Sequence, residues 1–252
     1  MPIAEFNSSA QVDVEASNAL SQDGAVIMRR ALSNDRFDHL RLLSIAAFAI
    51  MDLKSRELER GQSRPDDHLR SYVETYRRLQ YIGEDVVITL LSNTALANPT
   101  FSPIADALIK SVGPIFPSGP IFVPTKSVLR RQGTLETAYV VWHRDVHAVQ
   151  TVELENVFNC WVPCEPVGID RPSLQVVLGS NNVMKQHPVN YAIPDNPDDD
   201  QVLSQFGEES ICTAILDLGD VLIFSDHTIH RTQPMNNDAL TRTSGEFRFR
   251  CS

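Results

Sequence analysis

Residues 219–230 read Gly-Asp-Val-Leu-Ile-Phe-Ser-Asp-His-Thr-Ile-His, an apolar run between a glycine turn and two histidines. A short run rich in Val, Ile and Phe that follows a turn is typical of a β-strand. The two histidines, His227 and His230, then lie where this strand ends and the next begins. The stretch indicates a β-sheet protein that carries imidazole groups at the end of a strand.

Segments of the same kind fill the chain after about residue 115. Strands are expected at 121–132, 137–146, 157–162, 174–178, 211–216, 220–224, 228–233 and 245–250, with turn residues between them. About eight strands in succession are typical of a jelly roll or a closed barrel. The polar, turn-rich segment 196–200 is expected to be part of a long exposed loop between strands.

Helical patterns dominate the first half of the chain instead. Apolar residues recur at helical spacing over 37–48, after capping side chains at 33–35. Residues 62–81 also have a helical pattern. The Ser-Pro pair at 102–103 is a cap followed by proline, which is favoured at the first helical position. One short strand is expected at 24–28.

Together these patterns predict one domain over residues 1–252, with a helix-rich part at 1–115 and a jelly-roll core at about 116–252. The predicted fold class is α+β, mainly β, with helices that buttress one sheet of the jelly roll. A length of 252 residues is enough for a single barrel with such helical additions.

The chain is acidic, because 22 Lys and Arg against 32 Asp and Glu give a formal net charge of −10. Phosphate backbones and anionic lipids should repel it, so nucleic acid and membranes are not expected partners. The longest nearly apolar run, residues 42–51, is about half as long as a bilayer span. The N-terminus has no basic patch followed by an apolar stretch, so a cytoplasmic location is expected.

The four cysteines are expected to be reduced and mostly buried, as is usual in a cytoplasmic protein. They are Cys160, Cys164, Cys212 and Cys251. Cys160 and Cys164 lie in a strand-like segment without a second cysteine pair or a histidine at zinc spacing. A structural zinc site is therefore not expected.

A possible metal site begins in residues 140–145, which read Val-Val-Trp-His-Arg-Asp. Alternation along a strand places His143 and Asp145 on one face, and His227 or His230 can supply a second imidazole. Two histidines and one carboxylate on one face of an octahedral ion leave three positions open, as non-haem Fe(II) oxygenases require. A His-x-Asp triplet alone is weak evidence, because such triplets also occur by chance on polar strand faces.

The segments around this triplet resemble the phytanoyl-CoA dioxygenase-like family of 2-oxoglutarate oxygenases. The matching pieces, in family order, are Asp23 to Ile27, Trp142 to Asp145, Trp161 to Pro163, Leu174 to Asn181, and Gly219 to Phe224 leading to His230. The resemblance implies a double-stranded β-helix. It also implies Fe(II) as cofactor, with 2-oxoglutarate, O2 and a small-molecule substrate as partners.

The resemblance also chooses between the two downstream histidines. The family's histidine follows the Gly-Asp-x-x-x-Phe strand by a short turn, as His230 follows Phe224, and Asn236 matches further on. The implied ligands are therefore His143, Asp145 and His230, with His227 at the rim of the site. His147, on the same strand face, is either a substrate neighbour or a solvated residue, and both interpretations remain open.

Two further residues are implied for 2-oxoglutarate. Family members place an arginine shortly after the distal histidine, where it pairs with the C5 carboxylate; Arg242 lies twelve positions after His230. A guanidinium suits this role because it offers two parallel donors. Two rivals, Arg248 and Arg250, are expected to face solvent. Gln132 is the candidate for the C1 carboxylate.

Gln132 belongs to a set of three polar residues that alternate along the strand predicted before the metal motif. The other two are Lys126 and Arg130. In related enzymes a polar side chain on this strand often contacts the C1 carboxylate of 2-oxoglutarate. An exposed strand face is expected to explain at least one of the three.

The predicted reaction is hydroxylation of an unactivated C–H bond of a small molecule, with release of succinate and CO2, in a role such as secondary metabolism. Related halogenases replace the carboxylate ligand with a small residue, so Asp145 disfavours halogenation. The alternatives are an inactive metal-binding jelly roll and an Fe(II) oxygenase that does not use 2-oxoglutarate. No basic cluster is evident near the mouth of the site, so an acyl-CoA is no better supported than an amino acid or a natural product. A homodimer is also left open.

Overall fold

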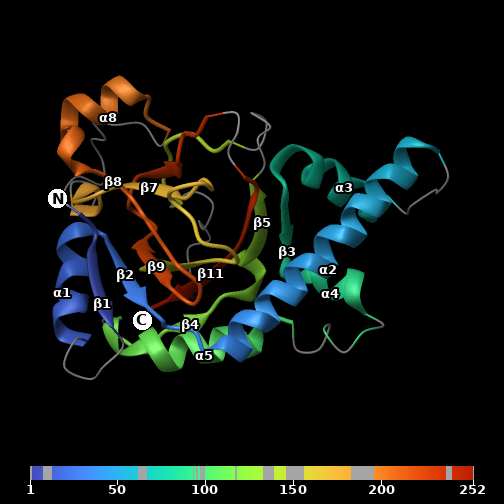
Figure 1. Cartoon of the computed structure of the whole chain (residues 1–252), viewed down its shortest axis with the longest axis horizontal. Coiled ribbons are helices and arrows are strands. Elements are labelled where there is room, and N and C mark those ends of the chain that lie inside the picture. The colour runs from blue at the N-terminus through green and yellow to red at the C-terminus, as the bar shows by residue number, and fades with distance from the viewer. Residues whose placement is uncertain are drawn as a thin grey trace.

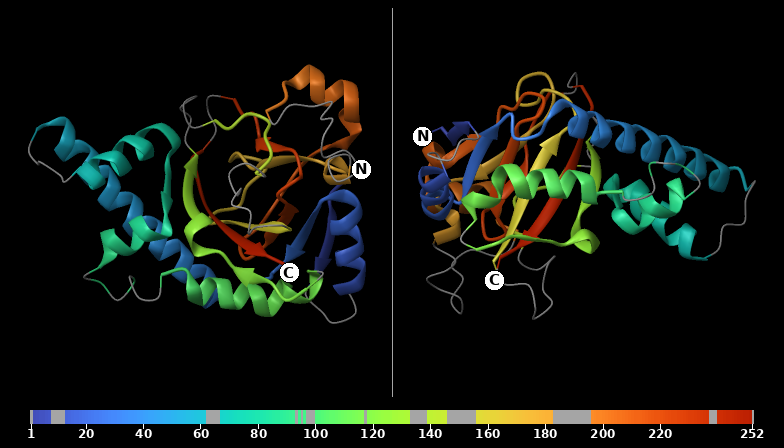
Figure 2. Two further views of the ribbon diagram at one scale, coloured as in Figure 1. Left: turned by 180° about the vertical axis from the view of Figure 1, so that it is seen from behind. Right: turned by 90° about the horizontal axis from the view of Figure 1, so that it is seen from below.

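The computed structural model describes residues 2–7, 13–61, 67–92, 94, 96, 100–116, 118–132, 139–145, 156–182, 196–236 and 240–251. It has a mixed α+β fold in which helices from the N-terminal half cover one face of a large sheet (Figure 1). A small sheet lies against the opposite face. The views from behind and from below show the same layers, with α2 and α3 projecting beyond the sheets (Figure 2).

The two sheets contain every strand of the described residues. The large sheet has eight strands: β1 (Ala4–Asn7), β2 (Ala25–Arg29), β9 (Val221–Ser225), β6 (Val157–Pro163), β11 (Arg242–Arg250), β5 (Val128–Gln132) and β3 (Tyr81–Gly83) in spatial order, with β4 (Ile121–Phe122) paired to β11. The small sheet has three: β10 (His230–Thr232), β7 (Leu174–Val177) and β8 (Ile211–Thr213).

Three of the described helices pack on the outer face of the large sheet: α1 (Asp13–Asp23), α2 (Asn34–Glu59) and α5 (Ser102–Val112) (Figure 1). Helices α3 (Asp67–Leu79) and α4 (Glu84–Leu91) pack against α2 and the edge strand β3, and α8 (Asp199–Phe206) lies beside the small sheet. Short 3₁₀ turns span Gly113–Ile115, Pro124–Lys126 and Glu208–Ser210. None of the described helices has the length and apolar character of a membrane span.

Alternation along β11 separates the helical core from the interior between the sheets. Phe247 and Phe249 are buried with the helices, and the Phe101 ring at the start of α5 lies 5.6 Å from Phe247. Residues at even positions, including Arg242 and Arg248, point to the other face, because successive side chains of a strand alternate. The interior that receives them is the natural location for a site.

The space between the two sheets has its own apolar core. Ile27, Trp161 and Leu222 of the large sheet pack with Val176 and Cys212 of the small sheet. Arg242 of β11 and its partner Gln132 of β5 adjoin this cluster, because the Arg242 guanidinium stacks on Trp161. All four cysteines are buried free thiols, as expected.

Several predicted elements differ from the structure in extent or type. The expected strand at 121–132 is interrupted by the 3₁₀ turn Pro124–Lys126. Of the expected strand at 137–146, residues 139–145 are described, and they form only an isolated bridge with β10. The expected loop at 196–200 runs into α8, whose first turn is held by a capping box between Asp198 and Gln201.

Other elements were missing from the prediction. Helices α1 and α4 carry weak sequence patterns and were not expected. The predicted division into a helix-rich part and a jelly-roll core at residue 115 does not separate the sheet from the helices. Strands β1, β2 and β3 come from the first part of the chain and belong to the large sheet. The helix-rich half thus supplies strands as well as cover.

Candidate active site

Three side chains converge where the 139–145 segment meets β10. His143 and His230 exchange backbone hydrogen bonds of 2.9 and 3.0 Å, which sets their rings 4.1 Å apart. Ligand atoms of His143, Asp145 and His230 all lie within 4.8 Å of one another, and they are the one group of this kind among the described residues. The structure therefore brings together the three residues that the sequence predicted as metal ligands.

The backbone orients both imidazoles for metal binding. Nδ1 of His143 donates to the Val141 carbonyl and Nδ1 of His230 to the Thr228 carbonyl, each at 2.9 Å. A carbonyl oxygen only accepts, so Nδ1 carries the proton and the lone pair of Nε2 is available to a metal ion. Burial and the neighbouring His143 ring lower the pKa of His230 to about 4, so this ligand is neutral near pH 7.

Asp145 supplies the negative charge of the site. Burial alone would raise the pKa of its carboxyl group, but Arg248, His230 and His143 together lower it well below the usual value. Oδ2 accepts hydrogen bonds from Asn159 and Arg248, at 2.7 and 3.1 Å. Oδ1 lies 3.8 Å from His143 Nε2. Two imidazoles and one ionised carboxylate are a donor set that suits Fe(II) and leaves coordination positions open for other ligands.

The two histidine segments are also supported from outside. Trp142 and Arg231 are the neighbours of the two ligand histidines, and the Arg231 guanidinium stacks 4.1 Å from the Trp142 ring centroid. Asp199, at the start of α8, accepts from Trp142 Nε1 at 2.7 Å and pairs with Arg231. The unpredicted helix α8 thus joins the two segments that carry the imidazoles.

Arg242 is fully buried, with 0% of its surface exposed. Its Nη1 donates to Ser244 Oγ at 2.6 Å, and its Cζ lies 4.7 Å from the Trp161 ring centroid. Among the described residues, Nε and Nη2 of Arg242 have no hydrogen-bond partner. Burial, reinforced by the Arg130 cation, lowers the pKa of Arg242 to about 9, which still leaves it charged near pH 7.

A buried cation with donors to spare is costly unless an anion completes it. The indole Nε1 of Trp161 is equally buried and also has no partner among the described residues. Trp161 therefore adds an N–H donor beside the guanidinium. The sequence pattern contained Trp161 as part of a strand motif, but nothing in it distinguished a donor from a core residue.

Gln132 is buried and lies directly opposite Arg242 in the β5–β11 ladder. Of its two expected strand companions, Arg130 forms a 3.0 Å ion pair with Glu246, and Lys126 lies in the 3₁₀ turn. None of the three is an exposed strand residue, so that expectation was wrong. The reason is that β5 faces the interior between the sheets.

The expectation that Arg248 faces solvent was also wrong. Its side chain is 11% exposed and contacts Asp145. Arg250, two residues on, is partly exposed. His227 lies outside the triad, and its Nε2 is 3.9 Å from Asp226. His147 lies outside the described residues.

A cavity of about 600 Å³ opens onto two residues of the metal triad, His143 and Asp145. His143, Asp145 and Arg248 form part of its wall. The remainder includes Met51, Tyr72, Tyr81, Ile82, Asp85, Val86, Lys126, Val128, Arg130, Val140 and Glu246, so that α2, α3, β3 and α4 complete it. Several basic side chains lie in this wall, although the sequence had indicated no basic cluster near the site. Two of them, Arg130 and Arg248, are paired with acidic residues.

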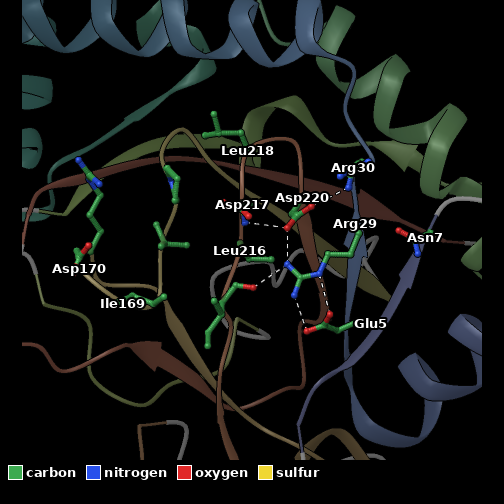
Figure 3. Close-up of a pocket in the computed structure, with 14 residues that line it drawn as sticks. Glu5, Asn7, Arg29, Arg30, Ile169, Asp170, Leu216, Asp217, Leu218 and Asp220 are labelled. Carbon is green, nitrogen blue, oxygen red and sulfur yellow. Dashed lines mark hydrogen bonds and ion pairs between the residues drawn. The ribbon is translucent and has the colours of Figure 1, made fainter.

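A larger cavity, of about 960 Å³, lies beside β1 and β2 and shares no lining residue with the triad (Figure 3). At its centre Arg29 pairs with Glu5 and Asp220 and donates to the Ile215 carbonyl. Its central cation is thus already satisfied. Size alone would favour this cavity, but the chemistry favours the one at the triad.

Comparison with known proteins agrees with this geometry. The family model for phytanoyl-CoA dioxygenase (PhyH) matches residues 20–244. Among curated proteins, none matches the sequence. EctD from S. alaskensis, solved with 2-oxoglutarate and 5-hydroxyectoine, has 15% identity and a TM-score of 0.60, over 98% of this chain and 79% of that one.

Two other solved structures have the same fold. SnoK, a non-haem α-ketoglutarate-dependent carbocyclase from nogalamycin biosynthesis, has 17% identity and a TM-score of 0.58, over 94% of this chain and 83% of its own. EvdMO1 has 19% identity and a TM-score of 0.59; the match covers 94% of this chain but 49% of EvdMO1, so this chain spans about half of that protein. With the family match over residues 20–244 and an intact His-Asp-His triad, the chain belongs to the phytanoyl-CoA dioxygenase family of Fe(II)- and 2-oxoglutarate-dependent oxygenases.

Proposed function

We propose that this protein oxidises an unactivated C–H bond of a small molecule, with hydroxylation as the default outcome and with succinate and CO2 as co-products. Its two sheets form the double-stranded β-helix of the family, and residues 1–252 act as one oxygenase domain. The observation that carries the proposal is the buried guanidinium of Arg242, which has two nitrogens without partners among the described residues, in an interior that also holds the triad.

His143 and His230 would hold Fe(II) through Nε2, and Asp145 through an oxygen of its carboxylate. When bound, Fe(II) and 2-oxoglutarate together supply O2 activation and the oxidising power for the C–H bond. The protein residues orient the reactants and exclude water. Asp145 also disfavours halogenation, because the carboxylate occupies the position that a halide would need.

Arg242 would bind the C5 carboxylate of 2-oxoglutarate, with Trp161 Nε1 as a further donor. The 2.6 Å hydrogen bond to Ser244 and stacking on Trp161 hold the guanidinium plane in place before the ligand arrives. Preorganised donors lower the entropic cost of binding. Gln132 is proposed as a second polar contact. Its register beside Arg242 favours the C5 end over the C1 end that the family resemblance suggested.

This arrangement weighs against the two other readings of the site. A metal-binding jelly roll without activity has no use for an unsatisfied buried guanidinium beside an intact triad. An Fe(II) oxygenase that does not use 2-oxoglutarate would need another partner for Arg242. In both cases the buried charge would remain a cost to folding that Glu246 and Glu165 offset only in part.

The cavity at the triad supports a small-molecule substrate. Its volume of about 600 Å³ and its mixed wall of tyrosines, aliphatic side chains and paired charges suit a compact polar molecule. The structure of EctD holds 5-hydroxyectoine, and SnoK comes from nogalamycin biosynthesis. The likeness to SnoK supports a role in secondary metabolism.

We further propose a homodimer formed by the outer face of α2. Leu42, Ile45 and Leu53 are 55%, 58% and 49% exposed and recur at helical spacing along this face. In an antiparallel pair of α2 helices Leu42 meets Leu53, and exposed Asp38 meets exposed Arg56 of the second copy. Ile45→Glu should convert a dimer to a monomer in light scattering, with Ile88→Glu on α4 as control. A monomeric wild type would refute the dimer.

The main experiment measures succinate formation against 2-oxoglutarate concentration. Arg242→Ala leaves a carboxylate without its partner, which should cost about 2–5 kcal/mol. The apparent 2-oxoglutarate constant should then rise at least about thirtyfold. Arg242→Lys should restore part of the affinity, because an ammonium keeps the charge and loses the two-pronged geometry.

Arg250→Ala, on the same strand, is the matched control and should behave as wild type. Iron content should be equal in all these variants. Substrate turnover in the complete absence of 2-oxoglutarate would refute the proposal.

A further inference from the structure

The two oxygens of Asp145 have different surroundings. Oδ2 accepts Asn159 Nδ2 at 2.7 Å and Arg248 Nη2 at 3.1 Å. Oδ1 lies 3.8 Å from His143 Nε2, and Oδ2 lies 4.0 Å from His230 Nε2. Both oxygens thus lie beside an imidazole, but among the described residues Oδ2 is the one that also accepts hydrogen bonds from the protein.

Arg248 is itself held by three further hydrogen bonds and by a 3.9 Å ion pair with Glu246. Nε donates to Asn159 Oδ1 at 2.9 Å, Nη1 donates to the Lys126 carbonyl at 2.7 Å, and the backbone N–H donates to Ser127 Oγ at 3.1 Å. Arg248 and Asn159 are also direct partners in the β11–β6 ladder. The guanidinium therefore stays in one orientation beside the carboxylate.

The same contacts orient the Asn159 amide. Because its Oδ1 accepts from Arg248 Nε, its Nδ2 must point to Asp145. Arg248 thus acts on Asp145 twice, directly through Nη2 and indirectly through the amide. A lysine could provide the charge, but it lacks the planar fork that makes both contacts at once.

We propose that Arg248, together with Asn159, is a positioning residue that makes Asp145 a one-oxygen ligand. A carboxylate with two free oxygens can bind a metal with both and so fill an additional coordination position. A three-residue site needs its remaining positions for the co-substrate and O2. Occupying Oδ2 keeps them available. The inference rests on the proposed metal site and extends it to residues that do not touch the metal.

The experiment titrates Co(II) into the metal-free full-length chain and follows the visible absorption bands, which report coordination number. Arg248→Lys and Arg248→Met are compared with wild type, and Arg250→Lys is the matched control on the same strand. Loss of contacts behind a metal ligand typically lowers metal affinity 10–100-fold. We expect at least about tenfold weaker Co(II) binding and altered bands for both Arg248 variants, with the control unchanged.

Circular dichroism of each metal-free variant checks folding, and Arg248→Lys, which keeps the charge, covers the case in which Arg248→Met does not fold. Wild-type affinity and bands in Arg248→Lys would overturn the positioning role, because they would show that charge alone suffices. A wild type that binds no Co(II) would instead overturn the proposed metal site, and this inference with it.

Discussion

Two arginines on strand β11 are both largely shielded from solvent but differ in how their charge is paired. Arg248, at the metal end, uses all three of its side-chain nitrogens on Asp145, Asn159 and the Lys126 carbonyl. Arg242, at the other end, uses one nitrogen on Ser244 and leaves two without a partner among the described residues. Both point from the same face of the strand into the space between the sheets.

Their pKa values follow this difference. Burial alone would lower the pKa of Arg248, but Asp145 and Glu246 raise it above its usual value. Burial and the Arg130 cation lower the pKa of Arg242 to about 9, and the opposing effect of Glu246 and Glu165 is too small to reverse this. A paired buried cation is part of the folded framework, whereas an unsatisfied one is tolerated where a ligand completes it. Strand β11 therefore carries the proposed metal site toward one end, called the metal end, and the proposed co-substrate site at the other, called the co-substrate end.

The largest expected effect is the loss of Fe(II) binding when a residue of the triad is changed. Changing His143, Asp145 or His230 to Ala should abolish Fe(II) binding, because two remaining ligands rarely hold a labile ion. His227→Ala should keep a wild-type iron content, as its ring lies outside the triad. Iron stoichiometry after anaerobic loading is the measurement. Loss of iron in His227→Ala with retention in His230→Ala would move the distal ligand.

The second prediction compares the two arginines directly, through the free energy of unfolding of their variants in the absence of metal. Arg248→Met leaves the buried Asp145 carboxylate short of its main partner and should lower the free energy of unfolding by about 3 kcal/mol. Arg242→Met removes an unsatisfied buried charge and should leave stability unchanged or raise it by about 1 kcal/mol. Urea denaturation of both metal-free variants measures the difference. Equal destabilisation by the two changes would remove the distinction between the two ends.

The third prediction tests whether Trp161 contributes a hydrogen bond at the proposed co-substrate site. Trp161→Phe keeps the aromatic surface under Arg242 and removes the indole N–H. Losing one neutral donor to a carboxylate should weaken 2-oxoglutarate binding by roughly 1–2 kcal/mol, or about tenfold, while metal binding stays as it is. Isothermal titration of the Mn(II)-loaded protein tests this. An unchanged affinity would show that Trp161 only packs against the guanidinium.

The smallest effect concerns the outer support of the histidines. Asp199 contacts both Trp142 and Arg231, but its side chain is 64% exposed. An exposed ion pair contributes at most about 1 kcal/mol, so Asp199→Ala should weaken Co(II) binding about fivefold or less. A loss as large as that of Arg248→Met would mean that the outer support matters as much as the contacts behind Asp145.

Local patterns predicted much of the fold. The Ser-Pro pair predicted the start of α5, although Phe101 and not Ser102 is its N-cap, and the apolar spacing over 37–48 predicted the first half of α2. Helix α8 was missed although Asp198 and Gln201 form a recognisable capping box, because the surrounding Pro and Asp residues are typical of turns. Helices α1 and α4 lacked a strong pattern of their own and are stabilised by packing on the sheet and on α2.

The sequence by itself selected the three candidate metal ligands. A period of two along an extended chain places His143 and Asp145 on one face wherever that segment lies. The resemblance of residues 219–230 to the family motif selected His230 as their partner, and the structure brings the three residues together. The sequence also placed Arg242 and Arg248 on one face of a strand. These assignments to one strand face depend only on backbone geometry over a few residues. Any sequence with the same spacing would give the same assignment.

Only the tertiary structure decided what each arginine does. Arg248 lies 103 positions from Asp145 and 89 from Asn159, so no local pattern could report that they meet. Whether a buried charge is paired depends on strands that the fold brings beside it. Desolvation makes this pairing important, because water screens the interaction of a cation with neighbouring charges and the protein interior does not. The energy of a buried arginine therefore depends strongly on the groups that surround it.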